Sequence, residues 1–165
     1  MKEYRQHRFT APKGATQILL VRHGESRAAS LENPFPLVAG QGDPELAIAG
    51  REQAERVGER LRHLPIDAIY VTNLTRTHET AAPLAGHLGL EPIEEPDLRE
   101  VHLGDWEGGL LRIKAFDNDP IYQQMQAEQR WDAIPGAESR AQIHARVERA
   151  LNKIAAGHPD QLIVA

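Results

Sequence analysis

The residues whose types and spacing could do chemistry begin where an apolar run ends. Residues 18–21 are all apolar, and Arg22, His23 and Gly24 follow them directly. A guanidinium group binds phosphate oxygens through paired hydrogen bonds. A glycine lets the backbone pass close to a ligand. These residue types therefore indicate an anion site, most simply for phosphate, with an imidazole inside it.

A second arginine can reach the same place if the chain folds as an α/β sheet. Residues 17–21 predict a strand covered on both faces, residues 67–72 predict a second strand, and Arg76 follows the second by a few residues. Ligands of open α/β sheets bind beyond the carboxyl ends of the strands. We therefore expect Arg22, His23 and Arg76 to meet at one edge of the sheet.

Strands alternate with helices along the rest of the sequence. A helix is expected from about residue 50 to 64, because Ala54, Val57, Leu61 and Leu64 recur at helical spacing. This alternation predicts an α/β fold, a three-layer sandwich whose central, mostly parallel sheet has helices on both faces. The other expected elements are a loop at 31–46, a helix at 75–88, a possible strand at 91–95, a loop at 98–109, a short helix at 118–131, a helix that Ser139 and Gln142 begin with a capping box, and a strand at 161–165.

The composition of the chain limits its class and its partners. The 165 residues suffice for one domain, and the formal net charge of -5 argues against a broad nucleic-acid surface. There is no cysteine, which excludes disulfides, thiolate chemistry and cysteine-ligated zinc. A cytoplasmic location fits this composition.

The amino-terminal residues differ from the rest of the chain. Residues 1–15 are polar, lack the apolar stretch of a secretory signal, and predict a mobile arm ahead of a domain at 16–165. The sequence contains no apolar run of about 20 residues, so no association with a membrane is expected.

Several segments of the chain resemble one enzyme family. The segments are LLVRHGES, GDPELAIAGREQA, LTRTHETA, LREVHLGDWEG and PGAESRAQIHARV, in this order along the chain. Together they are similar to the histidine phosphatase superfamily, which includes cofactor-dependent phosphoglycerate mutases and acid phosphatases. The resemblance runs from about residue 17 to residue 165 and is far more specific than Arg-His-Gly alone.

The resemblance implies a mechanism that needs no metal and no other cofactor. His23 would attack phosphorus and form a phosphohistidine, while Arg22 and Arg76 would hold the phosphoryl oxygens. Glu100 would protonate the leaving alcohol and then help to deprotonate the attacking water. Glu100 must therefore be protonated when substrate binds, and we expect burial or the charge of the phosphate to raise its pKa.

Three further residues are candidates for contact with the substrate. Gly24 adjoins the nucleophile in the sequence, and Ser26 either lines the pocket or caps the segment that follows. His102 lies two residues from Glu100, where it either borders the pocket or is an ordinary loop histidine.

The sequence departs from the family pattern at three places. Ala29 stands where relatives often carry an asparagine that contacts phosphate, and Ala47 stands where they usually carry threonine. A second catalytic histidine would follow the strand at 161–165, but the sequence ends at Ala165. Either the sequence omits a tail, which we favour because a strand is an odd natural end, or the chain is a truncated form. His158 precedes that strand and should lie at the opposite edge of the sheet.

Phosphomonoester hydrolysis on a small phosphorylated substrate is the function these features favour. A mutase is the alternative within the family, although the interval 108–134 is short for one; Arg112, Lys114 and Arg130 could bind a substrate carboxylate. A non-catalytic phosphate-binding protein and a metal hydrolase are alternatives from other classes. The sequence leaves a homo-oligomer possible.

Overall fold

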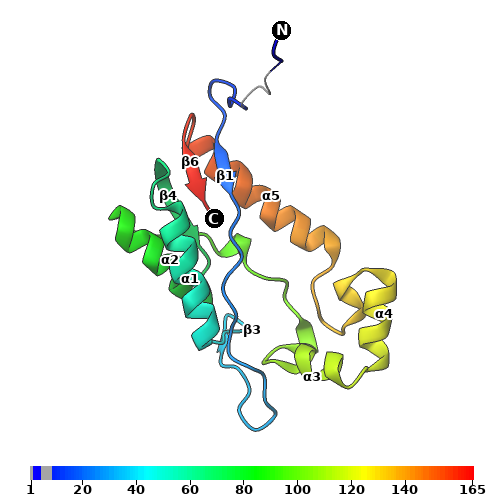
Figure 1. Cartoon of the computed structure of the whole chain (residues 1–165). Coiled ribbons are helices and arrows are strands. Elements are labelled where there is room, and N and C mark those ends of the chain that lie inside the picture. Colours follow the sequence, from blue (N-terminus) through cyan, green and yellow to red (C-terminus); the bar gives the residue numbers. More distant parts are fainter. Residues whose placement is uncertain (1, 5–8) are drawn as a thin grey trace.

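A parallel sheet of four strands forms the centre of the computed structural model, which describes residues 2–4 and 9–165 (Figure 1). The strands lie in the order β1 (Gln17–Leu19), β6 (Leu162–Val164), β4 (Ile66–Val71) and β5 (Ile93–Glu94). Every neighbouring pair is parallel, so the carboxyl ends of the strands share one edge of the sheet. The predicted α/β class and parallel sheet are confirmed.

Helices cover both faces of this sheet. Helices α1 (Ile48–Leu61) and α2 (Thr75–Leu88) lie on one face, and α5 (Arg140–Gly157) lies on the other (Figure 1). This arrangement confirms the predicted three-layer sandwich.

Two apolar clusters hold the layers together, one on each face of the sheet. On the face of α2, Ile69 and Leu84 are 1% and 2% exposed. On the face of α5, the helix residue Ile154 packs against Ala68 and Ile163 of the two central strands. Apolar residues therefore alternate between the two faces of β4, as expected for a covered strand.

Two of the three long predicted helices have local signals that the structure reproduces. Helix α2 has the predicted bounds and ends at Gly89, whose φ of 66° is the left-handed conformation that glycine adopts easily. The capping box of α5 is present, because the Ser139 side chain accepts a hydrogen bond from the Gln142 backbone N–H and the Gln142 side-chain oxygen accepts one from the Ser139 backbone N–H. Helix α1 begins after Ala47, which provides no side-chain cap.

The first predicted strand is shorter and less buried than expected. Strand β1 ends at Leu19, and the next residue, Leu20, is 73% exposed. The prediction of a strand at 17–21 covered on both faces was wrong, because β1 lies at the edge of the sheet with β6 as its strand neighbour among the described residues. Hydrogen bonding to the β6 segment continues one step further, because the Val21 N–H donates to the Ala165 carbonyl at 2.8 Å.

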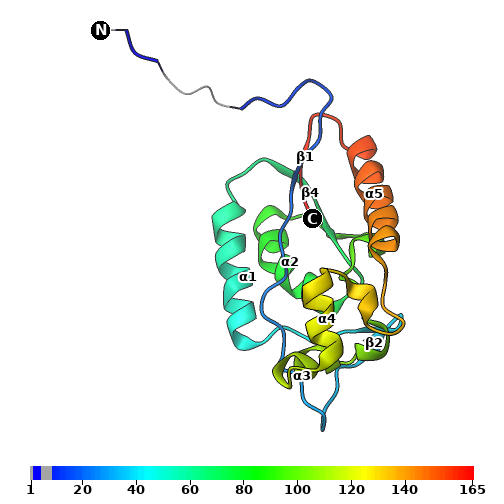
Figure 2. The same ribbon diagram turned by 90° about the vertical axis from the view of Figure 1, so that its right-hand side faces the viewer.

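Several short elements lie in segments that the sequence pattern predicted as loops or assigned to slightly different residues. A two-stranded hairpin, β2 (Leu37–Val38) and β3 (Gln41–Gly42), lies within the predicted loop at 31–46. The helix expected at 118–131 is α4 (Pro120–Glu128), which ends at Gln129 in the left-handed region, and α3 (Leu110–Phe116) precedes it unpredicted. Both helices lie below the carboxyl edge of the sheet, as Figures 1 and 2 show.

Part of the predicted amino-terminal arm, residues 1 and 5–8, lies outside the described residues. The arm at 1–15 therefore stays a prediction. Among the described residues, every helix is too short or too polar to cross a bilayer.

Candidate active site

The carboxyl edge of the sheet brings together residues from three parts of the chain. Arg22 and His23 follow β1, Arg76 is the second residue of α2, and Glu100 lies in an irregular loop after β5. All four line one cavity of about 280 Å³, which we call the inner cavity. The predicted meeting of Arg22, His23 and Arg76 at one edge is therefore what the structure shows.

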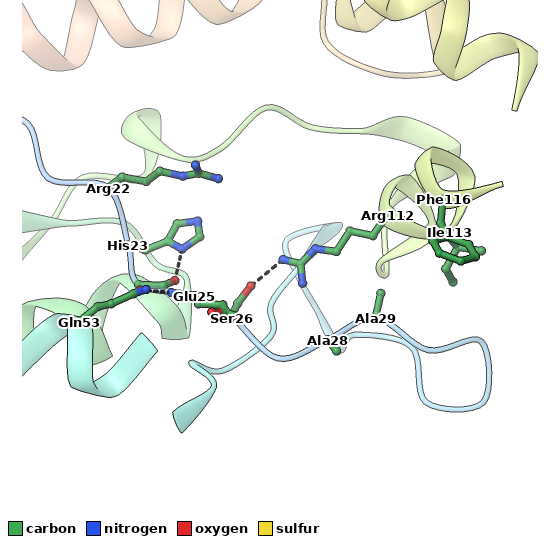
Figure 3. A pocket seen from close by; sticks show the side chains of 11 residues that line it. Arg22, His23, Glu25, Ser26, Ala28, Ala29, Gln53, Arg112, Ile113 and Phe116 are labelled. Carbon is green, nitrogen blue, oxygen red and sulfur yellow. Dashed lines mark hydrogen bonds between the residues drawn. The ribbon is translucent and has the colours of Figure 1, made fainter. Parts of the chain in front are cut away.

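A second, wider cavity adjoins the inner one. This outer cavity has a volume of about 820 Å³ and is lined by Gly24 as well as by Arg22, His23, Ser26 and Arg112, which it shares with the inner cavity. Figure 3 shows the side chains of Arg22 and Arg112 reaching toward the space beside His23 from opposite sides.

The tautomer of His23 follows from its hydrogen bond. Its Nδ1 lies 2.7 Å from the carbonyl oxygen of Gly24, which can only accept, so Nδ1 carries the proton (Figure 3). In a neutral ring Nε2 then keeps its lone pair. This Nε2 lies 3.9 Å from Oε2 of Glu100, and the His23 side chain is 16% exposed. The free nitrogen therefore faces the inner cavity, as a nucleophile would.

Glu100 is more acidic in this structure than an ordinary glutamate. A hydrogen bond from the His23 ring, made when Nε2 also carries a proton, lowers the pKa of Glu100 most; burial opposes this, and the positive charge of Arg76 lowers the pKa further. The Glu100 side chain is 48% exposed, so burial is too slight to dominate. Burial therefore does not bring the pKa of Glu100 above its ordinary value, which leaves the charge of a bound phosphate, the other expected cause, as the means of protonating Glu100.

Arg76 is a buried cation beside Glu100. The residue is 6% exposed, and its Nη1 donates a 3.0 Å hydrogen bond to the carbonyl oxygen of Gly42. Burial lowers the pKa of Arg76 and the charge of Glu100 raises it, so the guanidinium group stays protonated near neutral pH. The Gly42 carbonyl takes only part of its donor capacity, and the remaining N–H groups can serve an anion.

Gly24 has a packing role that the sequence did not predict. A Cβ atom at Gly24 would lie 2.5 Å from the carbonyl oxygen of Gly50 in α1, which no larger residue could tolerate. The Gly24 backbone N–H also donates to the Thr80 hydroxyl of α2 at 3.0 Å. The turn that carries His23 is therefore clamped between two helices, and Gly24 permits the close approach to Gly50.

Ser26 lies on the wall of both cavities. The residue is 5% exposed, and its hydroxyl accepts a 2.7 Å hydrogen bond from Nη2 of Arg112. Arg112 also donates to the Arg27 carbonyl at 2.8 Å, and its guanidinium lies over the Phe35 ring. Arg112, one of three basic residues left open by the sequence, is thus fixed beside the site.

Two other histidines considered in the sequence lie outside the walls of the two cavities. The described walls of the two cavities do not include His102, whose Nδ1 accepts a 3.0 Å hydrogen bond from the Gly104 backbone. His158 precedes β6 at the opposite edge of the sheet, as expected, and contacts Tyr70 and Gln161. Within the part of the chain that the structure describes, no cluster of three or more His, Asp or Glu side chains could hold a metal ion.

Sequence reasoning missed two residues that hold the loop of Glu100. Gln41 of β3 donates a 2.8 Å hydrogen bond to the Glu100 carbonyl, and Arg146 of α5 donates to the same oxygen at 3.1 Å. Gln41 stood in a predicted loop, and Arg146 stood beside the apolar stripe of a helix. Helical spacing carried no signal that distinguishes Arg146 from a solvated arginine.

Comparisons with known proteins identify the family. The sequence model of the histidine phosphatase superfamily (branch 1) matches residues 18–165. The chain is 36% identical over 151 residues to phosphoglycerate mutase-like protein 4 of Arabidopsis thaliana, covering 90% of this chain and 64% of that protein. It is 31% identical to phosphoserine phosphatase 1 of Hydrogenobacter thermophilus, covering 90% of this chain and 68% of that protein.

A solved structure supports the same family. The structure of a mycobacterial glucosyl-3-phosphoglycerate phosphatase matches with a TM-score of 0.72 at 28% identity, covering 91% of this chain and 73% of that one. The chain spans 61–64% of the length of the first two curated relatives. From the family match and these relatives we conclude that the chain belongs to the histidine phosphatase superfamily.

Proposed function

We propose that this chain carries the phosphoryl-transfer site of a phosphomonoester hydrolase that works through a phosphohistidine on His23. The observation that carries the proposal is the free Nε2 of His23, which faces the inner cavity because Nδ1 is engaged by the Gly24 carbonyl. Relatives named as phosphatases support hydrolysis.

The first step forms the phosphoenzyme. Nε2 of His23 attacks phosphorus and the ester P–O bond breaks, while the proton of Glu100 passes to the leaving oxygen to give a neutral alcohol. Arg22 and Arg76 bind the phosphoryl oxygens, whose negative charge they offset in the transition state.

The second step returns the enzyme to its starting state. Water attacks phosphorus, Glu100 as a carboxylate takes one proton from that water, and the N–P bond breaks. Inorganic phosphate leaves, and Nε2 of His23 recovers its lone pair. Glu100 gives up this proton to solvent once phosphate has left, because its pKa is lowered in the free site.

The bound phosphoryl group supplies the negative charge that raises the pKa of Glu100. Without a ligand, the pKa of Glu100 lies below its ordinary value. A dianion beside the carboxylate disfavours a third negative charge in the same place, so it raises the pKa of Glu100. Substrate binding thus promotes the protonated form that the first step requires.

Arg112 supports a leaving group that carries a second negative charge. Its guanidinium is fixed by Ser26 among the residues that line both cavities. An acid group on the alcohol portion of the substrate would bind the Arg112 guanidinium while the ester oxygen lies next to the Glu100 carboxyl. Arg112 also fits the mutase alternative, because a phosphoglycerate carries a carboxylate that this cation would bind. Relatives named as probable phosphoglycerate mutases are among those that match.

The activity is tested by phosphate release from small monoesters. We expect the chain to hydrolyse them, and we expect His23→Ala to lower the rate by at least about 1,000-fold, because the nucleophile is lost. His158→Ala, at the opposite edge, should change the rate little. Isomerisation of 3-phosphoglycerate without phosphate release would instead support the mutase.

The same preparation separates the remaining alternatives. A chelator should leave the rate unchanged for the metal-independent site that we propose, and would stop a metal hydrolase. Binding of vanadate without any turnover would support a non-catalytic phosphate-binding protein. A cytoplasmic location is also part of the proposal, supported by the absence of cysteine.

A further inference from the structure

Arg146 uses its whole side chain to hold one loop. The residue is 8% exposed on α5, and its Nε and Nη2 donate to the two carboxylate oxygens of Glu138 at 2.7 and 2.8 Å. Its Nη1 donates to the carbonyls of Asp97 and Arg99 at 2.8 Å each, and Nη2 donates to the carbonyl of Glu100 at 3.1 Å. These five hydrogen bonds match the five N–H donors of a guanidinium group.

The loop has no secondary structure that would fix it otherwise. Residues 99–102 belong to no helix or strand, and among the described residues backbone hydrogen bonds hold only the ends of this segment, at the Arg99 N–H and the His102 carbonyl. The carbonyls of Arg99 and Glu100 accept hydrogen bonds from side chains instead. Gln41 of β3, itself 5% exposed, also donates to the Glu100 carbonyl. The Glu138 carboxylate accepts from the backbone N–H of His102 at 2.8 Å. The backbone is therefore held at Glu100 and on both sides of it.

Arg146 itself does not reach the reaction. It is absent from the walls of the inner and outer cavities, and its partners are backbone carbonyls and Glu138. Any effect on the chemistry must pass through Glu100, whose carboxylate lies 3.9 Å from Nε2 of His23. A backbone shift of about 1 Å is enough to misplace a proton donor.

We propose that Arg146 is a positioning residue, which sets the distance between the Glu100 carboxyl and the oxygen that leaves phosphorus. The inference rests on the proposed function, because Arg146 acts only by placing the Glu100 carboxyl for the proton transfer to the leaving oxygen. Lysine can replace it only in part, since an ammonium has three donors and no planar fork.

The ratio of activities on two substrates with different leaving groups distinguishes a positioning role from a loss of stability, because unfolding lowers both activities equally. An alkyl phosphate must have its leaving oxygen protonated, whereas p-nitrophenolate leaves without a proton. We expect Arg146→Met to lower kcat/KM for an alkyl phosphate by about 100-fold and for p-nitrophenyl phosphate by less than about 10-fold. Arg146→Lys should give an intermediate ratio.

Two variants on the same helix serve as controls. Arg149→Met removes an exposed arginine that pairs with the Asp97 carboxylate at 3.1 Å and touches no carbonyl of the loop. Ile154→Val thins the buried contact between α5 and the sheet and so lowers stability without approaching the loop. Both should keep the wild-type ratio of the two substrates. An equal loss on both substrates in Arg146→Met would overturn the proposal.

A second measurement separates this proposal from the proposed function. The pKa of Glu100 is lowered by His23 and Arg76, so a displaced carboxyl should titrate closer to its ordinary value in Arg146→Met. Carbon-13 NMR reports this titration, with Glu100→Gln to assign the signal. An unchanged titration would sink the positioning role even if the enzyme is active. A shifted titration in a protein that releases no phosphate would retain the role and refute the phosphatase instead.

Discussion

At the residue scale, the chemistry depends on which atoms carry protons. A single backbone carbonyl, that of Gly24, assigns the Nδ1 proton of His23 and leaves Nε2 free. Glu100 faces that nitrogen, and it is a carboxylate in the free protein because its pKa is lowered. In the proposed mechanism, a neutral His23 ring is the nucleophile and Glu100 is an acid that gains its proton when substrate binds.

The first prediction concerns the titration of Glu100. In the free protein its pKa should lie below 4.5, and inorganic phosphate in the inner cavity should raise it, because two like charges disfavour ionisation. Carbon-13 NMR of the carboxyl signal, with and without phosphate, measures the shift. A pKa that stays constant or falls on binding would rule out the dianion as the source of the proton affinity.

The second prediction concerns Arg112 and the substrate. A hydrogen bond to a charged group contributes about 1.5–3 kcal/mol, so Arg112→Met should lower kcat/KM by about 10- to 100-fold for monoesters whose alcohol carries a carboxylate. Neutral alkyl esters should change by less than about threefold.

Lys114→Met on the same helix is the matched control, since Lys114 pairs with Asp119 and not with the site. An equal loss on both kinds of ester in Arg112→Met would mean that Arg112 contacts the phosphoryl group itself.

At the element scale, two helices beside the site differ in how their amino-terminal ends are capped. Helix α5 has a capping box at Ser139, whereas α1, which packs against the turn of His23 at Gly24, has no side-chain cap. Ala47 has an extended backbone, with φ of -68° and ψ of 169°, which is the conformation of a capping residue.

The third prediction follows from this difference between the two helices. Ala47→Ser should raise the free energy of unfolding by about 0.5–1 kcal/mol, because its hydroxyl can accept from a free N–H of the first turn. Ser139→Ala should lower it by a similar amount. Urea unfolding measures both, and a destabilised Ala47→Ser would show that the cap geometry is wrong.

Elements with local signals were predicted well. The bounds of α2 were predicted as 75–88, and the capping box located the start of α5, because both depend on neighbours within one turn. The exposure of Leu20 was missed, since it depends on which strand lies at the edge of the sheet. Helix α3 was missed because the pattern at Leu110–Phe116 carries no capping residue, and its cap is Gly109 in a left-handed conformation.

At the scale of the whole molecule, the parallel sheet explains why the site forms where it does. His23, Arg76 and Glu100 are distant in sequence, and they meet because the segments after β1, β4 and β5 all leave the same edge. The meeting of His23 and Arg76 was predictable from the order of elements, whereas Glu100 was expected there only from the family resemblance. The support given by Arg146 was not predictable, since it requires knowing that α5 packs beside the loop of Glu100.

The central claim is a covalent bond between phosphorus and Nε2 of His23. The direct test is to mix the protein with a labelled monoester, quench at alkaline pH within the first turnovers, and locate the label by peptide mass spectrometry. The account predicts an acid-labile, alkali-stable phosphoryl group on the peptide with His23, absent from His23→Ala. Phosphate release with the label on another residue, or with none bound during turnover, would contradict it.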